Sequence, residues 1–87
     1  MSRVPDETLP NDYLPGDYGR FRGEWYCTVP APYGFAGALR AHEVTEHADG
    51  TISVSPSILI THPGLPDRWH GYLEAGVWRA LDDCVAP

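Results

Sequence analysis

The chain has 87 residues, which is enough for one small domain, and such a domain buries only about 60–65% of the surface of its unfolded chain. Twelve acidic residues oppose six arginines and no lysine, so the net charge of −6 argues against binding to nucleic acid or to an anionic membrane. Mimicry of DNA by the acidic chain stays an open alternative. The longest dense apolar segment, 54–60, is interrupted by Ser55, Pro56 and Ser57, and the N-terminus lacks the apolar core of a secretory signal.

Residues 1–22 are expected to form an extended arm, and residues 23–87 a small β domain. Pro5, Pro10 and Pro15 disfavour helix and push their preceding residues towards extended conformations, so we expect neither a helix nor a paired strand there. Two interpretations remain for this arm. It is either a loose terminus or a segment held on a surface by its apolar side chains, which are Leu9, Tyr13, Leu14, Tyr18 and Phe21.

From residue 23 onward the pattern indicates strands. Residues 24–29 alternate and end at Pro30, and residues 30–37 are expected to form a loop. The next strands flank Ala48-Asp49-Gly50, a three-residue hairpin turn that pairs Val44 with Val54 and buries both. Pro56 predicts a bulge or an edge. A short helix within residues 35–42 is the competing assignment.

The last predicted hairpin spans residues 68–81. A two-residue Ala75-Gly76 turn would require a positive φ at Ala75, which costs about 1 kcal/mol, so we expect a three-residue turn that includes Glu74. In that register Leu73 faces Val77 and Tyr72 faces Trp78. His70, Tyr72 and Trp78 then share one face, either open to a partner or covered by the arm or by the strand that carries Trp25. The fold class is therefore predicted as mostly β, a small antiparallel meander of about five strands with an extended N-terminal arm.

Metal and catalytic motifs are weak. A structural zinc site needs four ligands. The two histidines nearest in sequence, His42 and His47, would point to opposite faces of a strand and so could not bind one ion together. We expect no metal and no cofactor, and free thiols at Cys27 and Cys84. Three alternating serines, at positions 53, 55 and 57, and the pair Asp82-Asp83 are interpreted as solvated surface. The chain is therefore expected not to be an enzyme; a metalloprotein or small hydrolase using Cys27, His70 and Cys84 is the alternative from another class.

The C-terminal half resembles a group of small uncharacterised phage and prophage proteins. In that group S-P-S-[LI]-L is followed by [CW]-H-x-[FY], a turn that ends in glycine, a short apolar strand and often D-C. The matching residues are Ser55, Pro56, Ser57, Ile58, Leu59, Trp69, His70, Tyr72, Gly76, Val77, Asp83 and Cys84. The lysine-free composition is similar to that of actinobacteriophage members. Many relatives also carry a cysteine knuckle that looks like a zinc site, but here Cys27 has no second cysteine beside it and Trp69 replaces another.

Charge, size and resemblance together predict a non-enzymatic, phage-type interaction protein. Its most concrete form is a virion accessory or decoration protein that binds a larger assembly; the alternative is a host-directed inhibitor of a bacterial protein or small signalling molecule. We expect it in the host cytoplasm or the virion, not exported by a signal peptide, with a phage structural protein or a host protein as its partner. Assembly into an oligomer stays open. The predicted contact residues are Leu9, Tyr13, Leu14, Tyr18, His70, Tyr72 and Trp78.

Overall fold

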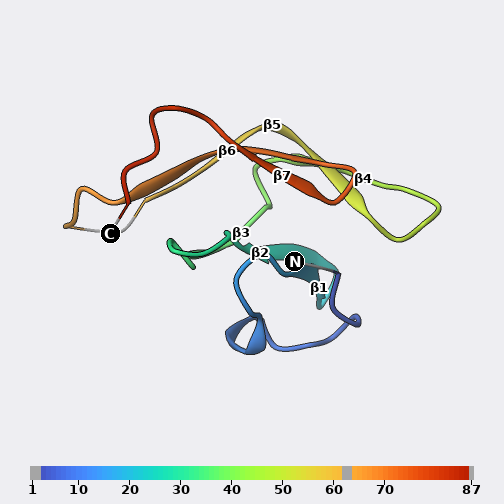
Figure 1. Cartoon of the computed structure of the whole chain (residues 1–87). Coiled ribbons are helices and arrows are strands. Elements are labelled where there is room, and N and C mark those ends of the chain that lie inside the picture. The colour runs from blue at the N-terminus through green and yellow to red at the C-terminus, as the bar shows by residue number, and fades with distance from the viewer. Residues whose placement is uncertain (1–2, 62–63, 87) are drawn as a thin grey trace.

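The computed structural model describes residues 3–61 and 64–86, which form two antiparallel sheets packed as layers (Figure 1). The prediction of a mostly β, antiparallel fold is confirmed. One sheet has three strands in the order β1-β2-β3, and the other has four in the order β4-β5-β6-β7. The elements are β1 (Tyr18–Phe21), β2 (Glu24–Thr28), β3 (Ala36–Ala38), β4 (Glu43–Glu46), β5 (Ile52–Thr61), β6 (Arg68–Glu74), β7 (Val77–Ala80) and one 3-10 turn, η1 (Pro10–Asp12).

The three-stranded sheet begins inside the predicted arm. β1 pairs with β2, with Tyr18 opposite Cys27, so the expectation that residues 1–22 contain no paired strand is wrong for Tyr18–Phe21. The aromatic and apolar side chains at Tyr18 and Phe21 favour a strand once β2 offers them a partner. β3 pairs with the other edge of β2, which shows that a strand and not a helix forms within residues 35–42.

The four-stranded sheet is a meander, and its first hairpin has the predicted register. Val44 pairs with Val54, and Gly50 N–H donates to the carbonyl of His47 across the three-residue turn. Between Val54 and Ile58 the pairing of β5 with β6 shifts, which confirms the predicted irregularity at Pro56. Because proline has no N–H for the ladder, the shift allows β5 to continue past it and pair again from Ile58.

The turn of the last hairpin differs from the predicted one. Leu73 pairs with Trp78 and Glu74 with Val77, so only Ala75 and Gly76 remain in the turn, at φ values of 46° and 79°. Two positive φ values are typical of a type I′ turn, whose twist matches that of the paired strands. This match outweighs the cost of about 1 kcal/mol at Ala75. The prediction was wrong by one residue, and that shift moves every side chain of β7 to the opposite face.

The core lies between the two sheets, with buried side chains from both. Its largest member, Trp69, comes from β6, and its ring meets that of Trp78 edge to face with centroids 5.4 Å apart. A short chain has few apolar residues, so it uses most of its large ones here. The buried cluster comprises Tyr18, Cys27, Val29, Leu39, Ile52, Val54, Ile58, Trp69 and Leu73.

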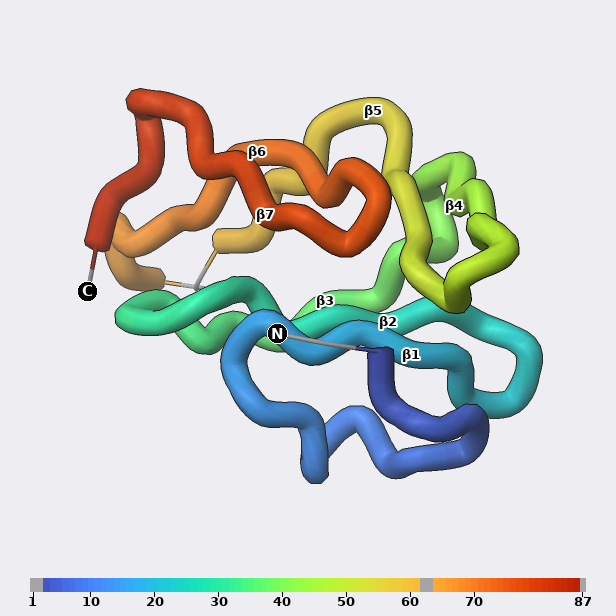
Figure 2. Tube along the Cα trace, turned by 45° about the vertical axis from the view of Figure 1, so that its right-hand side comes forward, coloured from blue at the N-terminus to red at the C-terminus, as the bar shows by residue number. Residues whose placement is uncertain are grey.

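The segment before β1 lies against the three-stranded sheet, which matches the interpretation of a held arm. Val4 N–H donates to the carbonyl of Tyr18, and Glu7 N–H to that of Arg20, each at 2.9 Å. Figure 2 shows this segment, in blue, looping beneath β1 and returning into it. The close approach depends on Gly19, since a Cβ there would lie 2.6 Å from Val4 Cγ2 and 2.8 Å from Tyr13 Oη. The arm thereby covers the side of β1 that faces away from the core.

Candidate functional site

The side of the four-stranded sheet that faces away from the core carries the candidate site. We define this outer face by three cross-strand pairs, Leu59 with His70, Tyr72 with Arg79 and Glu74 with Val77. These residues alternate with Ile58, Trp69, Gly71 and Leu73, which are buried. Neighbouring strand residues point to opposite sides, so the members of the outer face project away from the core.

Apolar side chains on the outer face are exposed. Leu59 and Val77 are each 54% exposed and Tyr72 is 40% exposed. Between them lie polar groups, and Arg79 Nε bonds Glu74 Oε1 at 2.8 Å. Apolar anchors within a polar surround are typical of the surfaces that proteins use to bind other proteins.

A line of hydrogen bonds crosses the same face. Ser57 Oγ lies 3.0 Å from His70 Nε2, and both carboxylate oxygens of Asp83 lie 3.0 Å from His70 Nδ1. Ser57 lies within the irregular stretch of β5 between Val54 and Ile58, His70 is on β6, and Asp83 comes from the segment after β7. This Ser–His–Asp line brings together a hydroxyl, an imidazole and a carboxylate from three separate parts of the chain.

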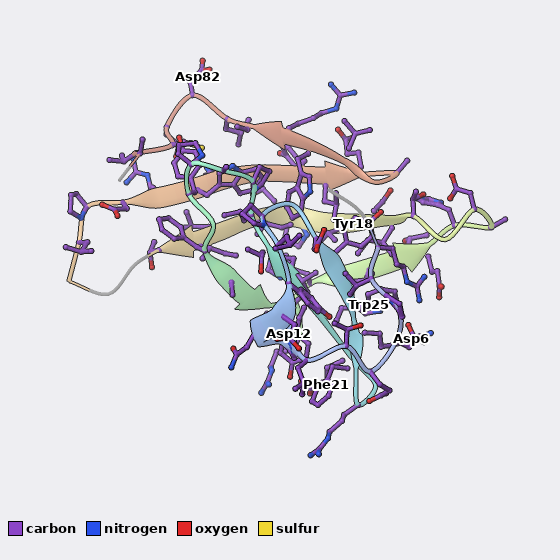
Figure 3. The ribbon with its side chains drawn as sticks, turned by 60° about the horizontal axis from the view of Figure 1, so that its bottom comes forward. Asp6, Asp12, Tyr18, Phe21, Trp25 and Asp82 are labelled. Carbon is purple, nitrogen blue, oxygen red and sulfur yellow. The ribbon has the colours of Figure 1, made fainter. Side chains whose placement is uncertain are left out.

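The segment after β7 folds back along β6 and so delivers Asp83. Arg68 and Val85 form an isolated antiparallel bridge, and Arg68 Nε donates to the carbonyl of Asp83 at 2.7 Å. Cys84 Sγ accepts from His70 N–H and donates to His70 O, both at 3.2 Å. Asp82 occupies the outermost part of this loop and points into solvent, as Figure 3 shows. Asp82 and Asp83 are both exposed, as the interpretation of this pair as solvated surface predicts, but Asp83 also bonds His70.

Hydrogen-bond chemistry sets the direction of each bond in the line. A carboxylate accepts only, so His70 must donate from Nδ1 to Asp83. In the neutral imidazole Nε2 is then the acceptor, and the Ser57 hydroxyl donates to it. The hydrogen bond from His70 lowers the pKa of Asp83, because it stabilises the carboxylate against its protonated form.

The predicted contact residues do not form one surface. Leu9 and Leu14 are exposed on the arm, but Tyr13 and Tyr18 are buried within the chain's own structure. His70 and Tyr72 are on the outer face. Trp78 is not, because the one-residue shift in the hairpin turns it to the core side. The predicted cluster of His70, Tyr72 and Trp78 on one face is therefore wrong.

Trp78 instead ties the sheet to the arm. Its indole Nε1 donates to the carbonyl of Gly16 at 2.9 Å, and its ring packs against Trp69. The strand that carries Trp25 was the alternative to the arm as a cover for that predicted cluster, but Trp25 packs against the core. The guanidinium groups of Arg3 and Arg20 lie 4.9 and 5.0 Å from the centre of its ring, and Figure 3 shows Trp25 on the arm side with Asp6 and Phe21.

The cysteines are free thiols in separate environments. Cys27 is buried in the core, and burial raises the pKa of its thiol to about 12, which disfavours the reactive thiolate. Cys84 is half-buried against the backbone of His70. Within residues 3–61 and 64–86, no group of three or more His, Cys, Asp or Glu side chains lies close enough to hold a metal ion. One of the four histidines, His62, lies outside the described residues.

A cleft elsewhere on the molecule lies between the arm and the two hairpin turns. Its polar lining includes Arg3, Asp6 and Asp49. Arg3 is already paired there with Asp6 and Glu46 and also donates to the carbonyl of Gly50 at 3.2 Å. Since these contacts satisfy its charge within the chain, the cleft does not offer a free cation to a ligand.

Neither protein-family models, nor curated proteins, nor solved structures gave a match to this chain, so the resemblance to small phage proteins stays a prediction. In the part of the chain that the structure describes, no helix is long and apolar enough to cross a membrane. Sequence reasoning did not select Ser57 and Asp83 as site residues. The signal that could have found Ser57 is its position beside Pro56, where a bulge was predicted; Asp83 carried no comparable signal.

Proposed function

We propose that this chain is a phage-type interaction protein that binds a larger protein assembly through its outer face. The observation that carries the proposal is the exposure of Leu59, Tyr72 and Val77 on that face. The chain is short of apolar surface for its own core, so leaving three large apolar side chains outside it costs stability that a partner would restore. This role requires binding and no chemical step.

The arm supplies a second contact in this proposal. Leu9 and Leu14 are exposed, whereas Tyr13 beside them is buried and anchors the segment. Because the arm is held on the three-stranded sheet, its leucines have a defined position and lose little conformational entropy when they bind. A decoration protein with two such contacts could bridge neighbouring subunits of a virion.

The partner proposed first is a phage structural protein, because the resemblance in the C-terminal half is to phage proteins. The net charge of −6 favours a partner surface that is neutral or basic. The alternative is a host-directed inhibitor, for which the same outer face would bind a bacterial protein.

Mass spectrometry of purified phage particles tests the proposal. Wild-type chain should be found at a fixed ratio to a capsid or tail protein, and Leu59→Ser or Tyr72→Ser should lower that ratio about tenfold or more if these residues act as interface anchors. Leu65→Ser is the matched control, because Leu65 is 53% exposed on the loop before β6 and not on the outer face. Absence of the chain from particles, with capture of one host protein that depends on Tyr72, would replace the virion role with the inhibitor role. Equal loss with Leu65→Ser would contradict both.

A further inference from the structure

We propose that Ser57, His70 and Asp83 form a nucleophilic site that cleaves small uncharged esters through an acyl-Ser57 intermediate. This goes beyond the proposed binding role and departs from the sequence-based expectation that the chain is not an enzyme. Ser57 is the nucleophile, His70 the general base and acid, and Asp83 the residue that orients the imidazole.

The geometry matches what such a site requires. The Ser57 Oγ to His70 Nε2 distance of 3.0 Å is within reach for proton transfer, and Asp83 holds the opposite nitrogen with both oxygens at 3.0 Å. The Asp83 contact selects the tautomer in which Nε2 is free to accept the serine proton. Many histidines contact a serine, but here a carboxylate also holds the other ring nitrogen and so completes the constellation.

Each of the three residues is held by contacts of its own backbone. His42 Nε2 donates to the carbonyl of Ser57 at 3.2 Å, and Leu81 N–H donates to the carbonyl of His70 at 2.8 Å. Arg68 holds the carbonyl of Asp83. His70 pairs with Leu59 across the strands, which places it more rigidly than a loop would.

The chemical steps balance without a co-reactant other than water. Ser57 Oγ bonds to the acyl carbon while its proton moves to His70 Nε2; the ester C–O bond breaks, and the leaving alcohol takes that proton. Water then attacks the acyl-serine and gives a proton to Nε2. The C–Oγ bond breaks, Ser57 regains its proton, and the products are one carboxylic acid and one alcohol.

The surroundings of the site indicate the class of ester. Leu59 pairs with His70 across the strands, and Tyr72 is two residues further along β6, so exposed apolar groups flank the imidazole. In the same region Arg79 pairs with Glu74 and Arg68 with Asp83, so the charges there balance, while the chain as a whole is acidic. An uncharged ester with a short acyl group and an aromatic leaving group fits these apolar contacts.

The chain contains its own control for a serine that only contacts a histidine. Ser53, four residues before Ser57 on β5, has its Oγ 2.7 Å from His47 Nε2. The same oxygen also accepts from Ala75 N–H at 2.9 Å. Among the described contacts, no carboxylate bonds the His47 ring. If proximity to histidine were enough for reactivity, Ser53 would react as readily as Ser57.

The test uses the full chain with p-nitrophenyl acetate and, separately, a fluorophosphonate, with intact-mass and peptide mass spectrometry to locate the label. We expect one label per chain, on Ser57 and not on Ser53 or Cys84. Ser57→Ala should remove labelling and ester cleavage, and Asp83→Asn should slow both about tenfold or more, because the wrong tautomer is then favoured.

Two further variants keep the result interpretable. Ser57→Cys retains a nucleophile at the same position and should restore acylation by p-nitrophenyl acetate, which a merely structural role of Ser57 would not do. Ser53→Ala should leave labelling unchanged. Thermal unfolding of each variant checks that it is folded. Labelling of Ser53 equal to that of Ser57, or no label on Ser57 in folded wild-type protein, would overturn the proposal while leaving the binding role untouched.

Discussion

At the scale of single residues, Trp78 connects the arm, the core and the four-stranded sheet through one side chain. Its indole N–H bonds the carbonyl of Gly16, and its ring packs on Trp69. We expect Trp78→Phe to lower the free energy of unfolding by about 1–3 kcal/mol, because the carbonyl of Gly16 loses its donor and the smaller ring leaves a void. Urea denaturation measures this. Tyr72→Phe on the outer face is the control and should change stability by less than about 0.5 kcal/mol; equal effects would mean that Trp78 is not an anchor.

Asp83 couples the outer face to pH. Its pKa in the folded chain is below the ordinary value of 3.8, chiefly because His70 donates to the carboxylate. At pH values above the ordinary pKa, the ionised carboxylate therefore stabilises the folded chain. This contribution to the free energy of unfolding is lost as the pH falls through the lowered pKa. We expect the difference in unfolding free energy between wild type and Asp83→Asn to shrink on acidification from pH of about 5 to about 2.

Asp82→Asn is the control for that titration, because it removes the same charge from the adjacent position, which points into solvent. Denaturant unfolding at each pH provides the measurement. A difference between wild type and Asp83→Asn that stays constant over the range would mean that the contact with His70 does not stabilise the folded state.

At the scale of elements, the β6–β7 turn contains a residue with a strained backbone. Ala75 has a φ of 46°, in the left-handed region that residues with a Cβ avoid, and Asn occupies this region more readily. We expect Ala75→Asn to raise the free energy of unfolding by about 0.5–1 kcal/mol, since it relieves this strain and suits a type I′ turn. Ala48→Asn, in the turn of the first hairpin where φ is not positive, should give no such gain. No difference between the two variants in thermal unfolding would rule out this source of strain.

The two hairpins also show how far the sequence predicts the elements. In the first, Ala48-Asp49-Gly50 carries a clear turn signal and the alternation of Val44, Ile52 and Val54 agrees with it, so the register was predicted correctly. In the second, the two solutions differ by about 1 kcal/mol at Ala75, and the packing of Trp78 against Trp69 adds to the match of twist that decides between them. Such a tertiary contribution is not visible in the turn residues themselves.

The Ser–His–Asp line was not predictable for a related reason. Its serine is placed by the shift in pairing between Val54 and Ile58, and its carboxylate by the segment that folds back along β6 after β7. Pro56 predicts that a shift occurs there but does not give its size. The return of Asp83 depends on contacts with Arg68 and His70 that are distant in sequence.

At the scale of the whole molecule, the two layers differ in what covers them. The arm lies on the three-stranded sheet, whereas Leu59, Tyr72 and Val77 remain exposed on the outer face of the four-stranded sheet. The predicted division into an arm at residues 1–22 and a domain at residues 23–87 places the binding contacts partly on the arm. In the structure, Tyr13 and Tyr18 of that segment are buried and stabilise the chain's own fold. The outer face therefore carries most of the proposed binding surface.

The most direct test of that claim is photo-crosslinking from the outer face in phage-infected cells. A photoreactive amino acid replaces Tyr72 in one strain and Leu65 in the control strain, and the linked proteins are identified by mass spectrometry. We expect position 72 to link in high yield to one phage structural protein and position 65 to link to it weakly, because Leu65 is more exposed than Tyr72 but lies off the outer face. Equal and unspecific linking from both positions would contradict the claim that the outer face is the binding surface.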